Sequence, residues 1–428
     1  MKQNETTPFH WKPFSPKAKN YLANSETWIN IAVGSIRSGK TITVLTRFIE
    51  FIIQSENEDF MIIGKTLKSL ERNVVKPLRK MLTSLGIPFE ENGYLNEIYF
   101  MGNTICLFGA GKKGDDEKIQ GSTFGGALID ESTVITEDSF KMILSRNSLP
   151  NSCIFITCNP ANPNHYLYTQ YITNTDLLQR ETVKVWTFEL GDNYSLSTDY
   201  IENLKSSYPE DSLFYKRYIL GQWVSGNGAI YPHFTDENIY TEDKPCSWFD
   251  YIEAGSDYGA SSTTCWDWIG IKEYDDHNEY YIFDEGGHNA KEEGVSLTNS
   301  EIVDMIIKQQ DKYGLNMWNT FYPSHDATSF ETELVKNEDI VMNIQKYTPD
   351  LLECIGEIDN LFDKNYIHIH SRCEKTIECI QGYEWDGNAA KRGEDKPLKV
   401  DDHYADSIRA PIMNHLFNNG MIGFSMGV

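Results

Sequence analysis

The sequence lacks any long hydrophobic run. Among its 428 residues, no apolar stretch approaches the roughly 18–20 residues that a membrane span needs. The N-terminal stretch MKQNETTPFHWKPF also has no continuous apolar segment that could act as a signal peptide. We therefore expect neither insertion into a membrane nor secretion by that route.

Closely spaced cysteines are lacking as well. The eight cysteines are scattered along the chain, with no CxxC pair and no Cys/His array at zinc spacing. This pattern is typical of a protein kept in a reducing cytoplasm. The composition, with 40% hydrophobic, 13% aromatic and 24% charged residues, is that of folded domains, and the length predicts two or three of them.

Positive charge is scarce. The chain has 38 Lys and Arg residues against 63 Asp and Glu, a net charge of −25. This balance argues against indiscriminate binding to polyanions, so any contact with nucleic acid must use local patches or metal ions. The excess is uneven, with −6 for residues 1–250 and −19 for residues 251–428. The two halves are therefore expected to be different kinds of domain.

The order of apolar patterns predicts two α/β domains. From residue 29 to about 190, short apolar runs alternate with helical patterns, which predicts a mainly parallel sheet covered on both faces. A helical segment at 198–221 follows, interrupted at Pro209. Glycines and prolines mark a connection at 226–250. The remainder, 251–428, predicts a mixed α/β domain.

A complete phosphate-binding motif lies between the first predicted strand and helix. Gly34-Ser-Ile-Arg-Ser-Gly39-Lys40-Thr41 matches GxxxxGK[ST]. In such a loop, backbone N–H groups hold the β-phosphate, Lys40 reaches the β and γ oxygens, and the Thr41 hydroxyl ligates Mg²⁺. Because there is no NKxD motif to read guanine, the sequence predicts ATP with Mg²⁺ as the ligand.

Two further strand ends carry polar side chains. Asp130 and Glu131 close the apolar run GGALI, at the edge where α/β sheets bind ligands. We expect Asp130 to hold the magnesium through water and Glu131 to polarise the attacking water, which favours a motor or switch over a small-molecule kinase. The next strand ends in Thr157-Cys-Asn159-Pro160. Asn159 is a candidate sensor of the γ-phosphate, and a plain proline turn is the alternative.

A basic stripe follows the second predicted strand. It comprises Lys65, Lys68, Arg72, Lys76, Arg79 and Lys80. Their spacing gathers most of them on one side of a helix. The stripe could track phosphates or simply form a solvated face.

Acidic residues of the second half fall at the ends of separate predicted elements. They are Asp257, Asp326 and the C-terminal group Asp401, Asp402 and Asp406, with His403 between them. Three such acids could converge on one or two divalent cations, the arrangement for in-line phosphodiester hydrolysis. Taken singly, each aspartate also fits a turn or a helix cap.

Taken in order, these motifs resemble the large terminase subunit of tailed bacteriophages, an ATP-driven DNA packaging motor joined to a nuclease. The stretches that carry the resemblance are FSPKAKNYL, GSIRSGKT, GGALIDES, FITCNPANP, SLFYKRYILGQWVSGNGAIYPHF, SDYG, SHDATS and DDHYADSIR. The resemblance implies a RecA-like ATPase domain over 1–225 with lid helices at about 198–221. It also implies a linker at 226–250 and an RNase H-like nuclease domain over 251–428.

The resemblance implies roles for the second-half residues. Asp257, Asp326 and Asp406 match the family's three metal-binding acids, which would hold two Mg²⁺ or Mn²⁺. His403 matches a histidine three residues before the last of them, and Asp402 is an adjacent alternative for the third ligand, as is Asp401.

The same resemblance bears on the arginines. Arg37, inside the phosphate loop, matches an arginine common in the family and is a candidate charge stabiliser in cis. Family members often carry a trans-acting arginine shortly before the strand that ends in the two carboxylates. Here Gln120 occupies that region, with Lys118 nearby, and Arg146 is another candidate.

The implied partners are double-stranded DNA, a small terminase subunit, the portal protein of the procapsid and a homo-oligomeric ring formed during packaging. The implied location is the cytoplasm of the infected bacterial host, transiently at the portal vertex, with no membrane. Three other interpretations stay open at this point: a helicase-like ATPase, which needs a second RecA-like domain, an ATP-gated DNA repair nuclease, and a non-cutting ATP switch that docks on a partner.

Overall fold

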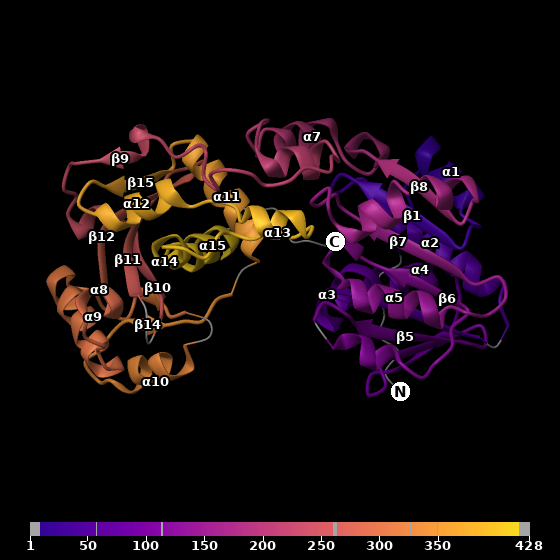
Figure 1. The fold of residues 1–428 in the computed structure, drawn as a ribbon, viewed down its shortest axis with the longest axis horizontal. Coiled ribbons are helices and arrows are strands. Elements are labelled where there is room, and N and C mark those ends of the chain that lie inside the picture. The colour runs from indigo at the N-terminus through magenta and orange to yellow at the C-terminus, as the bar shows by residue number, and fades with distance from the viewer. Residues whose placement is uncertain are drawn as a thin grey trace. The chain divides into compact units, whose positions relative to one another are not determined.

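A computed structural model describes residues 9–56, 58–112, 114–259, 263–324, 327–348 and 350–418. The chain divides into two compact units, which Figure 1 shows in indigo to magenta and in red to yellow. The first unit comprises the described residues through Ser225 together with Ala389–Glu394, and the second comprises Gly226–Asn388 and the described residues from Asp395 onward.

The first unit is built on an eight-stranded sheet in the order β3-β4-β5-β2-β6-β7-β1-β8. Its strands are β1 (Ile29–Gly34), β2 (Asp59–Gly64), β3 (Phe89–Asn92), β4 (Glu97–Phe100), β5 (Asn103–Gly109), β6 (Gly126–Ile129), β7 (Cys153–Cys158) and β8 (Val183–Phe188). The six strands from β5 to β8 in the sheet order are parallel, and β3, β4 and β5 form an antiparallel edge. The predicted mainly parallel α/β sheet is therefore confirmed.

Side-chain alternation along the central strands explains why both faces are covered. In β2, Phe60 and Ile62 pack into one core while Met61 and Ile63 pack into the other, because successive side chains point to opposite faces. The first core also contains residues of α1, α2 and α4, and the second contains residues of α5. The helices of this unit are α1 (Pro16–Asn24), α2 (Lys40–Ile53), α3 (Leu67–Leu70), α4 (Lys76–Ser84), α5 (Glu137–Arg146), α6 (Thr175–Gln179) and α7 (Thr198–Lys205).

The second unit has a seven-stranded sheet in the order β14-β13-β10-β11-β12-β15-β9. Its strands are β9 (Ile239–Tyr240), β10 (Tyr251–Asp257), β11 (Thr263–Glu273), β12 (Asn278–Asn289), β13 (Thr320–Tyr322), β14 (Asn343–Ile344) and β15 (Ile367–His370). The central strands β10, β11 and β12 are antiparallel, and the other four pair in parallel. The predicted mixed α/β domain is confirmed.

Helices cover both faces of the second sheet. The helices of this unit are α8 (Ala290–Glu293), α9 (Asn299–Tyr313), α10 (Thr328–Lys336), α11 (Leu351–Asp363), α12 (Glu374–Gly382), α14 (His403–Ser407) and α15 (Arg409–Asn418). Helix α13 (Gly387–Lys391) begins in this unit, and its residues from Ala389 onward belong to the first unit. Residues of α9 and α10 pack with Trp266 and Trp268 in one core. Helices α14 and α15 pack against β10, so the C-terminal acids of the sequence are brought to the first strand of the sheet.

Residues 226–250, expected to form a linker, lie instead in the second unit. Strand β9 pairs in parallel with β15 and completes one edge of the sheet, and Phe249 is buried in the core beneath β10 and β11. The glycines and prolines that suggested a connection therefore mark turns within a domain. The expected lid segment contains α7 and a π-helical turn at Tyr215–Ile219, separated around Pro209.

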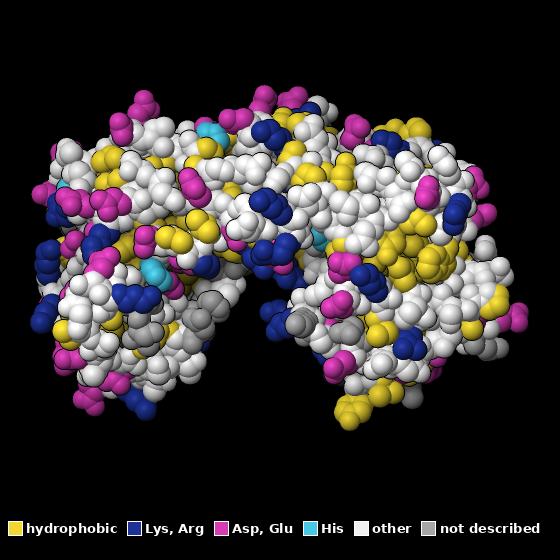
Figure 2. Space-filling model, in the orientation of Figure 1, with side chains coloured by type: hydrophobic (Ala, Val, Ile, Leu, Met, Phe, Trp, Pro, Cys, Tyr) yellow, Lys and Arg dark blue, Asp and Glu magenta, His cyan; other side chains and the backbone are white. Residues whose placement is uncertain are grey.

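Charge is mixed on the visible surface. On the face shown in Figure 2, the coloured acidic and basic side chains are interspersed over both units. Within the described part of the chain, no helix is long and apolar enough to cross a membrane.

Candidate functional site

The phosphate-binding loop joins β1 to α2 in a conformation that only glycine allows at its start. Gly34 has a φ of +146°, and a Cβ there would lie 1.8 Å from the carbonyl oxygen of Phe188. The loop is anchored by two backbone bonds, from Ser35 N to Phe188 O (3.0 Å) and from Ile36 N to Tyr218 O (2.9 Å). The loop is therefore held in shape by the protein itself.

Lys40 begins α2 and is buried in the pocket that the loop encloses. Its Nζ donates to Gly34 O (3.0 Å), Ser35 O (2.5 Å) and Asn159 Oδ1 (3.0 Å). Burial lowers the pKa of Lys40 to about 8. Thr41 lines the same pocket. The lysine of the first motif and the amide of the third strand end therefore meet in one pocket.

The two carboxylates after β6 are tied to β7 through Thr157. The Thr157 hydroxyl donates to Asp130 Oδ1 (2.7 Å) and accepts from the backbone N–H of Glu131 (3.2 Å). Burial raises the pKa of Asp130, and burial together with the Asp130 charge raises the pKa of Glu131 to about 7. Both carboxylates line the pocket that holds Lys40.

Glu131 has a left-handed backbone, with a φ of +52°. Such a conformation is uncommon for a residue other than glycine and costs of the order of 1–3 kcal/mol, a cost that recurs at functional sites. We take this strain as a second indication that the Glu131 carboxylate has a chemical role.

Sequence analysis missed Asn193, which holds the tip of the phosphate loop. Its Nδ2 donates to the carbonyl oxygen of Arg37 (2.6 Å), and its Oδ1 accepts from Ser195 N (3.1 Å) and Ser195 Oγ (2.6 Å). Arg37 itself has a φ of +54° and lines the pocket. The signal was the stretch Asp-Asn-Tyr-Ser after β8, which is typical of an Asx turn.

The residues considered for a trans-acting role do not line the pocket of the phosphate loop. Gln120 is exposed after a short 3-10 turn, and Lys118 pairs with Asp115 (2.6 Å). Arg146 ends α5, and its carbonyl oxygen accepts from Phe124 N, just before β6 begins. Arg146 is thus at the amino edge of the sheet, opposite the edge that carries the phosphate loop.

A second pocket adjoins the phosphate loop. It shares Gly39, Ile42, Pro77, Asn193 and Ser195 with the first pocket. Its other lining residues include the aromatic side chains Phe9, Trp11, Phe14 and Tyr194 and the basic side chains Arg72, Lys76 and Lys80. Half of the predicted basic stripe therefore faces this pocket. Arg79 instead forms ion pairs with Glu71 and Glu91.

The pKa values of Glu131 and Lys40 predict a narrow pH optimum for ATP turnover. If Glu131 polarises the attacking water, it must be a carboxylate, so kcat/KM should fall about tenfold per pH unit below about pH 7. Phosphate binding needs Lys40 as ammonium, so kcat/KM should fall again above about pH 8. Measuring kcat/KM from pH 5.5 to 9.5 tests this. A rate that stays constant from pH 7 to pH 5.5 would contradict the role of Glu131.

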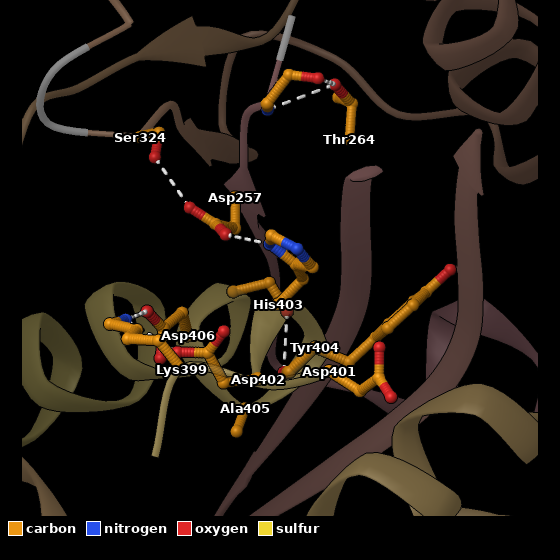
Figure 3. A network of polar contacts seen from close by, with 12 residues as sticks. Asp257, Thr264, Ser324, Lys399, Asp401, Asp402, His403, Tyr404, Ala405 and Asp406 are labelled. Carbon is orange, nitrogen blue, oxygen red and sulfur yellow. Dashed lines mark hydrogen bonds and ion pairs between the residues drawn. The ribbon is translucent and has the colours of Figure 1, made fainter. Parts of the chain in front are cut away.

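In the second unit, the structure joins the first predicted acid to the predicted histidine. His403 Nδ1 donates to Asp257 Oδ2 (2.6 Å), and Ser324 Oγ donates to Asp257 Oδ1 (3.0 Å) (Figure 3). Burial acts to raise the pKa of Asp257, but the hydrogen bond and charge of His403 lower it overall. The hydrogen bond with Asp257 raises the pKa of His403.

Asp402 and Asp406 are engaged by basic side chains. Lys399 Nζ contacts Asp402 Oδ2 (2.6 Å) and Asp406 Oδ2 (3.2 Å), and Figure 3 shows the three side chains together. Arg409 forms a further ion pair with Asp406 Oδ1 and donates to Tyr383 Oη (2.7 Å). Neither Lys399 nor Arg409 was singled out from the sequence.

The remaining acids are placed as follows. Asp326 lies outside the described residues. Asp401 is exposed, with a φ of +49°, and its backbone oxygen accepts from Cys379 Sγ (2.9 Å). Within the described ranges, no group of three or more His, Cys, Asp or Glu side chains is close enough to hold a metal ion. The donor chemistry of Asp257 and Asp402 nevertheless suits Mg²⁺ or Mn²⁺, which prefer carboxylate oxygens.

Comparisons with known proteins extend over almost all of the chain. Residues 31–236 match the family model of the N-terminal part of T4-like-virus-type terminase large subunits. A structure of the large terminase from a thermophilic bacteriophage, in its second crystal form, is 28% identical, with a TM-score of 0.83 over 95% of this chain and 100% of that one. No curated protein matches the chain.

Nucleotide complexes of the same thermophilic bacteriophage protein are equally similar. The ADP complex is 28% identical, with a TM-score of 0.81 over 96% of this chain and 100% of that one. The ATP-γ-S complex is 28% identical, with a TM-score of 0.80 over 94% of this chain and 98% of that one. The expected fold class, a mainly parallel α/β domain followed by a mixed α/β domain as in a large terminase, is confirmed by this likeness.

Proposed function

The chain belongs to the large terminase subunits of tailed bacteriophages, and on that premise we propose that it is a DNA packaging motor. It hydrolyses ATP to move double-stranded DNA into a procapsid and cuts the concatemer with a two-metal endonuclease. The observation that carries the proposal is the meeting of three motif ends in one pocket, where Lys40 contacts Asn159 and lies beside Asp130 and Glu131.

In ATP hydrolysis, the residues of this pocket have distinct roles. Gly34 and Gly39 shape the loop whose N–H groups hold the β-phosphate, and Lys40 moves its hydrogen bonds to the β and γ oxygens. Thr41 would ligate Mg²⁺ and Asp130 would hold it through water, and the ion would neutralise charge on the phosphates. Glu131 orients water and accepts its proton.

Asn159 connects the γ-phosphate to the rest of the first unit. It touches Lys40, and its backbone oxygen accepts from the Thr133 hydroxyl (3.4 Å), next to the two carboxylates. Loss of the γ-phosphate therefore changes the surroundings of a residue whose side chain is bonded to Lys40 and whose backbone is bonded to Thr133. We propose that Asn159 acts as the sensor of hydrolysis.

The adjoining aromatic pocket would take the base of the nucleotide. Trp11 and Tyr194 lie on its lining with Phe9 and Phe14, and aromatic faces are suited to stacking on a purine. Lys76 and Lys80 on the same lining add positive charge toward the phosphates. The bound nucleotide would thus occupy both pockets, with its phosphates in the loop.

Arg37 is proposed as the charge stabiliser of this site. A guanidinium beside the developing charge of the γ-phosphoryl group is worth about 10³–10⁵ in rate. We expect Arg37→Ala to lower ATPase kcat by about 10³-fold, whereas Arg146→Ala, at the opposite sheet edge, should change it by less than about threefold. Steady-state ATPase assays of both proteins test this. A larger loss in the Arg146 protein would move the stabiliser there and indicate sites shared between subunits.

For DNA cutting, we propose Asp257, Asp326 and Asp406 as the metal-binding acids, with His403 beside them and Asp402 as the alternative third ligand. Two Mg²⁺ or Mn²⁺ ions there would activate water and stabilise the leaving oxygen. Asp257 is the best supported, since it is held in place by His403 and Ser324. Lys399 and Arg409 neutralise Asp402 and Asp406, so a cation must compete with them.

The proposed partners follow from the family. They are double-stranded DNA, a small terminase subunit, the portal protein of the procapsid and further copies of this chain in a ring. The proposed location is the cytoplasm of the infected host, transiently at the portal vertex. A helicase would need a second mainly parallel motor sheet, whereas the second unit is built on the antiparallel strands β10, β11 and β12.

One experiment separates the proposal from its rivals. Purified protein is incubated with supercoiled plasmid and Mg²⁺ or Mn²⁺, and ATPase is measured in parallel with and without procapsids carrying their portal. A packaging motor should nick or linearise the plasmid. It should also hydrolyse ATP and make DNA resistant to added nuclease, the latter only when procapsids are present. A non-cutting switch predicts no cleavage, and a repair nuclease predicts cleavage that does not depend on procapsids.

A further inference from the structure

A shallow pocket in the second unit is not used by the proposed acids. It lies between α9, α12, α14 and the carboxyl end of β12. Its lining residues are Trp266, Glu285, Gly286, Gly287, Met305, Lys308, Gln309, Lys375 and Tyr404. Two lysines and one tyrosine therefore line the same pocket.

Several lysines of the same acidic unit are already paired. Lys272, Lys312, Lys346 and Lys399 each pair with a carboxylate. Among the described residues, neither ammonium group in the pocket, that of Lys308 or that of Lys375, has an ion-pair partner. Where the second half of the chain carries a net charge of −19, two lysines that line one pocket without an ion-pair partner are a local site for an anion.

The other polar groups leave the pocket open to such an anion. The Glu285 carboxylate is turned to α12, where it accepts from Lys375 N (3.1 Å), Thr376 N (2.9 Å) and Thr376 Oγ1 (2.7 Å). Among the described residues, Tyr404 Oη has no hydrogen-bond partner. The Glu285 charge is thus satisfied, while the lysines and the phenol are available as donors.

The wall of the pocket is rigid. Gln309 Oε1 accepts from Trp266 Nε1 (2.5 Å) and Trp268 Nε1 (2.8 Å). A Cβ at Gly287 would lie 2.6 Å from Tyr404 Oη, and one at Gly286 would lie 2.3 Å from the Trp266 ring. The two glycines therefore let Trp266 and Tyr404 close directly onto β12. A rigid wall lowers the entropy cost of binding.

Strand register places the Gly287 and Tyr404 side of this pocket on the sheet face of the proposed nuclease acids, and α9 brings Lys308 to the same edge of β12 from the other face. Asp257 is opposite Cys265, and Cys265 is opposite Gly287, so two strand spacings, about 10 Å, separate Asp257 from Gly287. Tyr404 directly follows His403, the partner of Asp257, and Figure 3 shows its ring extending away from that pair. Successive nucleotides of a DNA strand are about 3.4 Å apart, so Asp257 and Gly287 are separated by about the length of three nucleotides.

We propose that Lys308, Lys375 and Tyr404 Oη bind a backbone phosphate of the DNA strand that is cut, and so hold that strand across Asp257. This inference rests on the proposed nuclease function. Phosphate contacts of this kind fix position without reading sequence, and each is salt-dependent because it releases a counterion. The site gives an acidic domain a way to hold DNA close to its acids.

The test compares two double variants with the same loss of charge. Lys308→Gln/Lys375→Gln removes both ammonium groups of the pocket. Lys336→Gln/Lys364→Gln removes two exposed lysines elsewhere in the unit and serves as the control. A third protein, Tyr404→Phe, removes only the hydroxyl group. ATPase activity and thermal unfolding of each full-length protein show whether the fold is intact.

Binding to a short DNA duplex is measured in EDTA at several salt concentrations. For the pocket double variant, the slope of log Kobs against log[salt] should shrink by about 1, the value for one phosphate contact, and the control should keep the wild-type slope. In plasmid cleavage, the pocket variant should raise KM about tenfold and leave kcat within about twofold. Tyr404→Phe should show a smaller rise in KM.

Different failures have different meanings. If the pocket and control variants have equal slopes, or equal KM values, the phosphate site is wrong and the nuclease proposal is unaffected. If the pocket variant shows the smaller salt slope but the wild-type protein cuts no DNA, the nuclease proposal fails and the phosphate contact stands. If wild-type protein neither binds nor cuts DNA, both are overturned.

Discussion

Glu131→Gln protein is expected to bind ATP at near wild-type affinity and to hydrolyse it about 10²–10⁴-fold more slowly, the range that a positioned general base contributes. The amide keeps the size of the carboxylate in its half-buried position but cannot accept the proton of water. Lys40→Ala should differ by losing binding as well, because its ammonium group reaches the phosphates.

The measurement is ATP binding by equilibrium titration and turnover by phosphate release, on the same preparations. Glu137→Gln is the matched control, since Glu137 is a partly exposed carboxylate in the first turn of α5 that pairs with Lys141. It should keep wild-type turnover within about twofold, because surface ion pairs of this kind contribute little. Wild-type turnover by the Glu131 protein would show that another group activates water.

The residues that meet in the phosphate-loop pocket could be picked out from the sequence because each of their motifs is local. Gly34 to Thr41 is a contiguous motif, and Asp130 and Asn159 each end an apolar run. Parallel strands put their carboxyl ends at one edge, so three separate motifs had to meet. Asn193 was missed because its bond to the Arg37 carbonyl joins positions that sequence spacing does not relate.

The arrangement of acids in the second unit was less predictable, because it depends on contacts between residues far apart in the chain. Asp257 and His403 are 146 residues apart, and only the packing of α14 on β10 brings them into contact. Lys399 and Arg409 carry ordinary surface-type side chains in sequence, yet they neutralise two of the acids. The segment 226–250 was expected to be a linker because of its glycines and prolines, which are equally suited to turns inside a domain.

The two candidates for the third metal ligand, Asp402 and Asp406, differ in their positions on helix α14. Asp402 is the N-cap of α14 and is buried, whereas Asp406 lies one turn further on and is held by Arg409. Both reach Lys399, so either carboxylate could exchange that ammonium for a cation. Comparing Asp402→Asn with Asp406→Asn in the cleavage assay assigns the ligand, because the true ligand shows the larger loss.

Asp257→Ala protein should lose plasmid cleavage by more than about 10²-fold, beyond what loss of an outer-shell metal partner alone costs. Without this carboxylate, the remaining acids repel one another around a poorly held cation, and His403 and Ser324 lose their common partner. ATPase activity should survive, because Lys40 and Glu131 lie in the other unit. Asp401→Asn is the matched control, since Asp401 is exposed and asparagine tolerates its positive φ. Full-strength cutting by the Asp257→Ala protein, after removal of contaminating nuclease, would mean that the active site lies elsewhere in the chain.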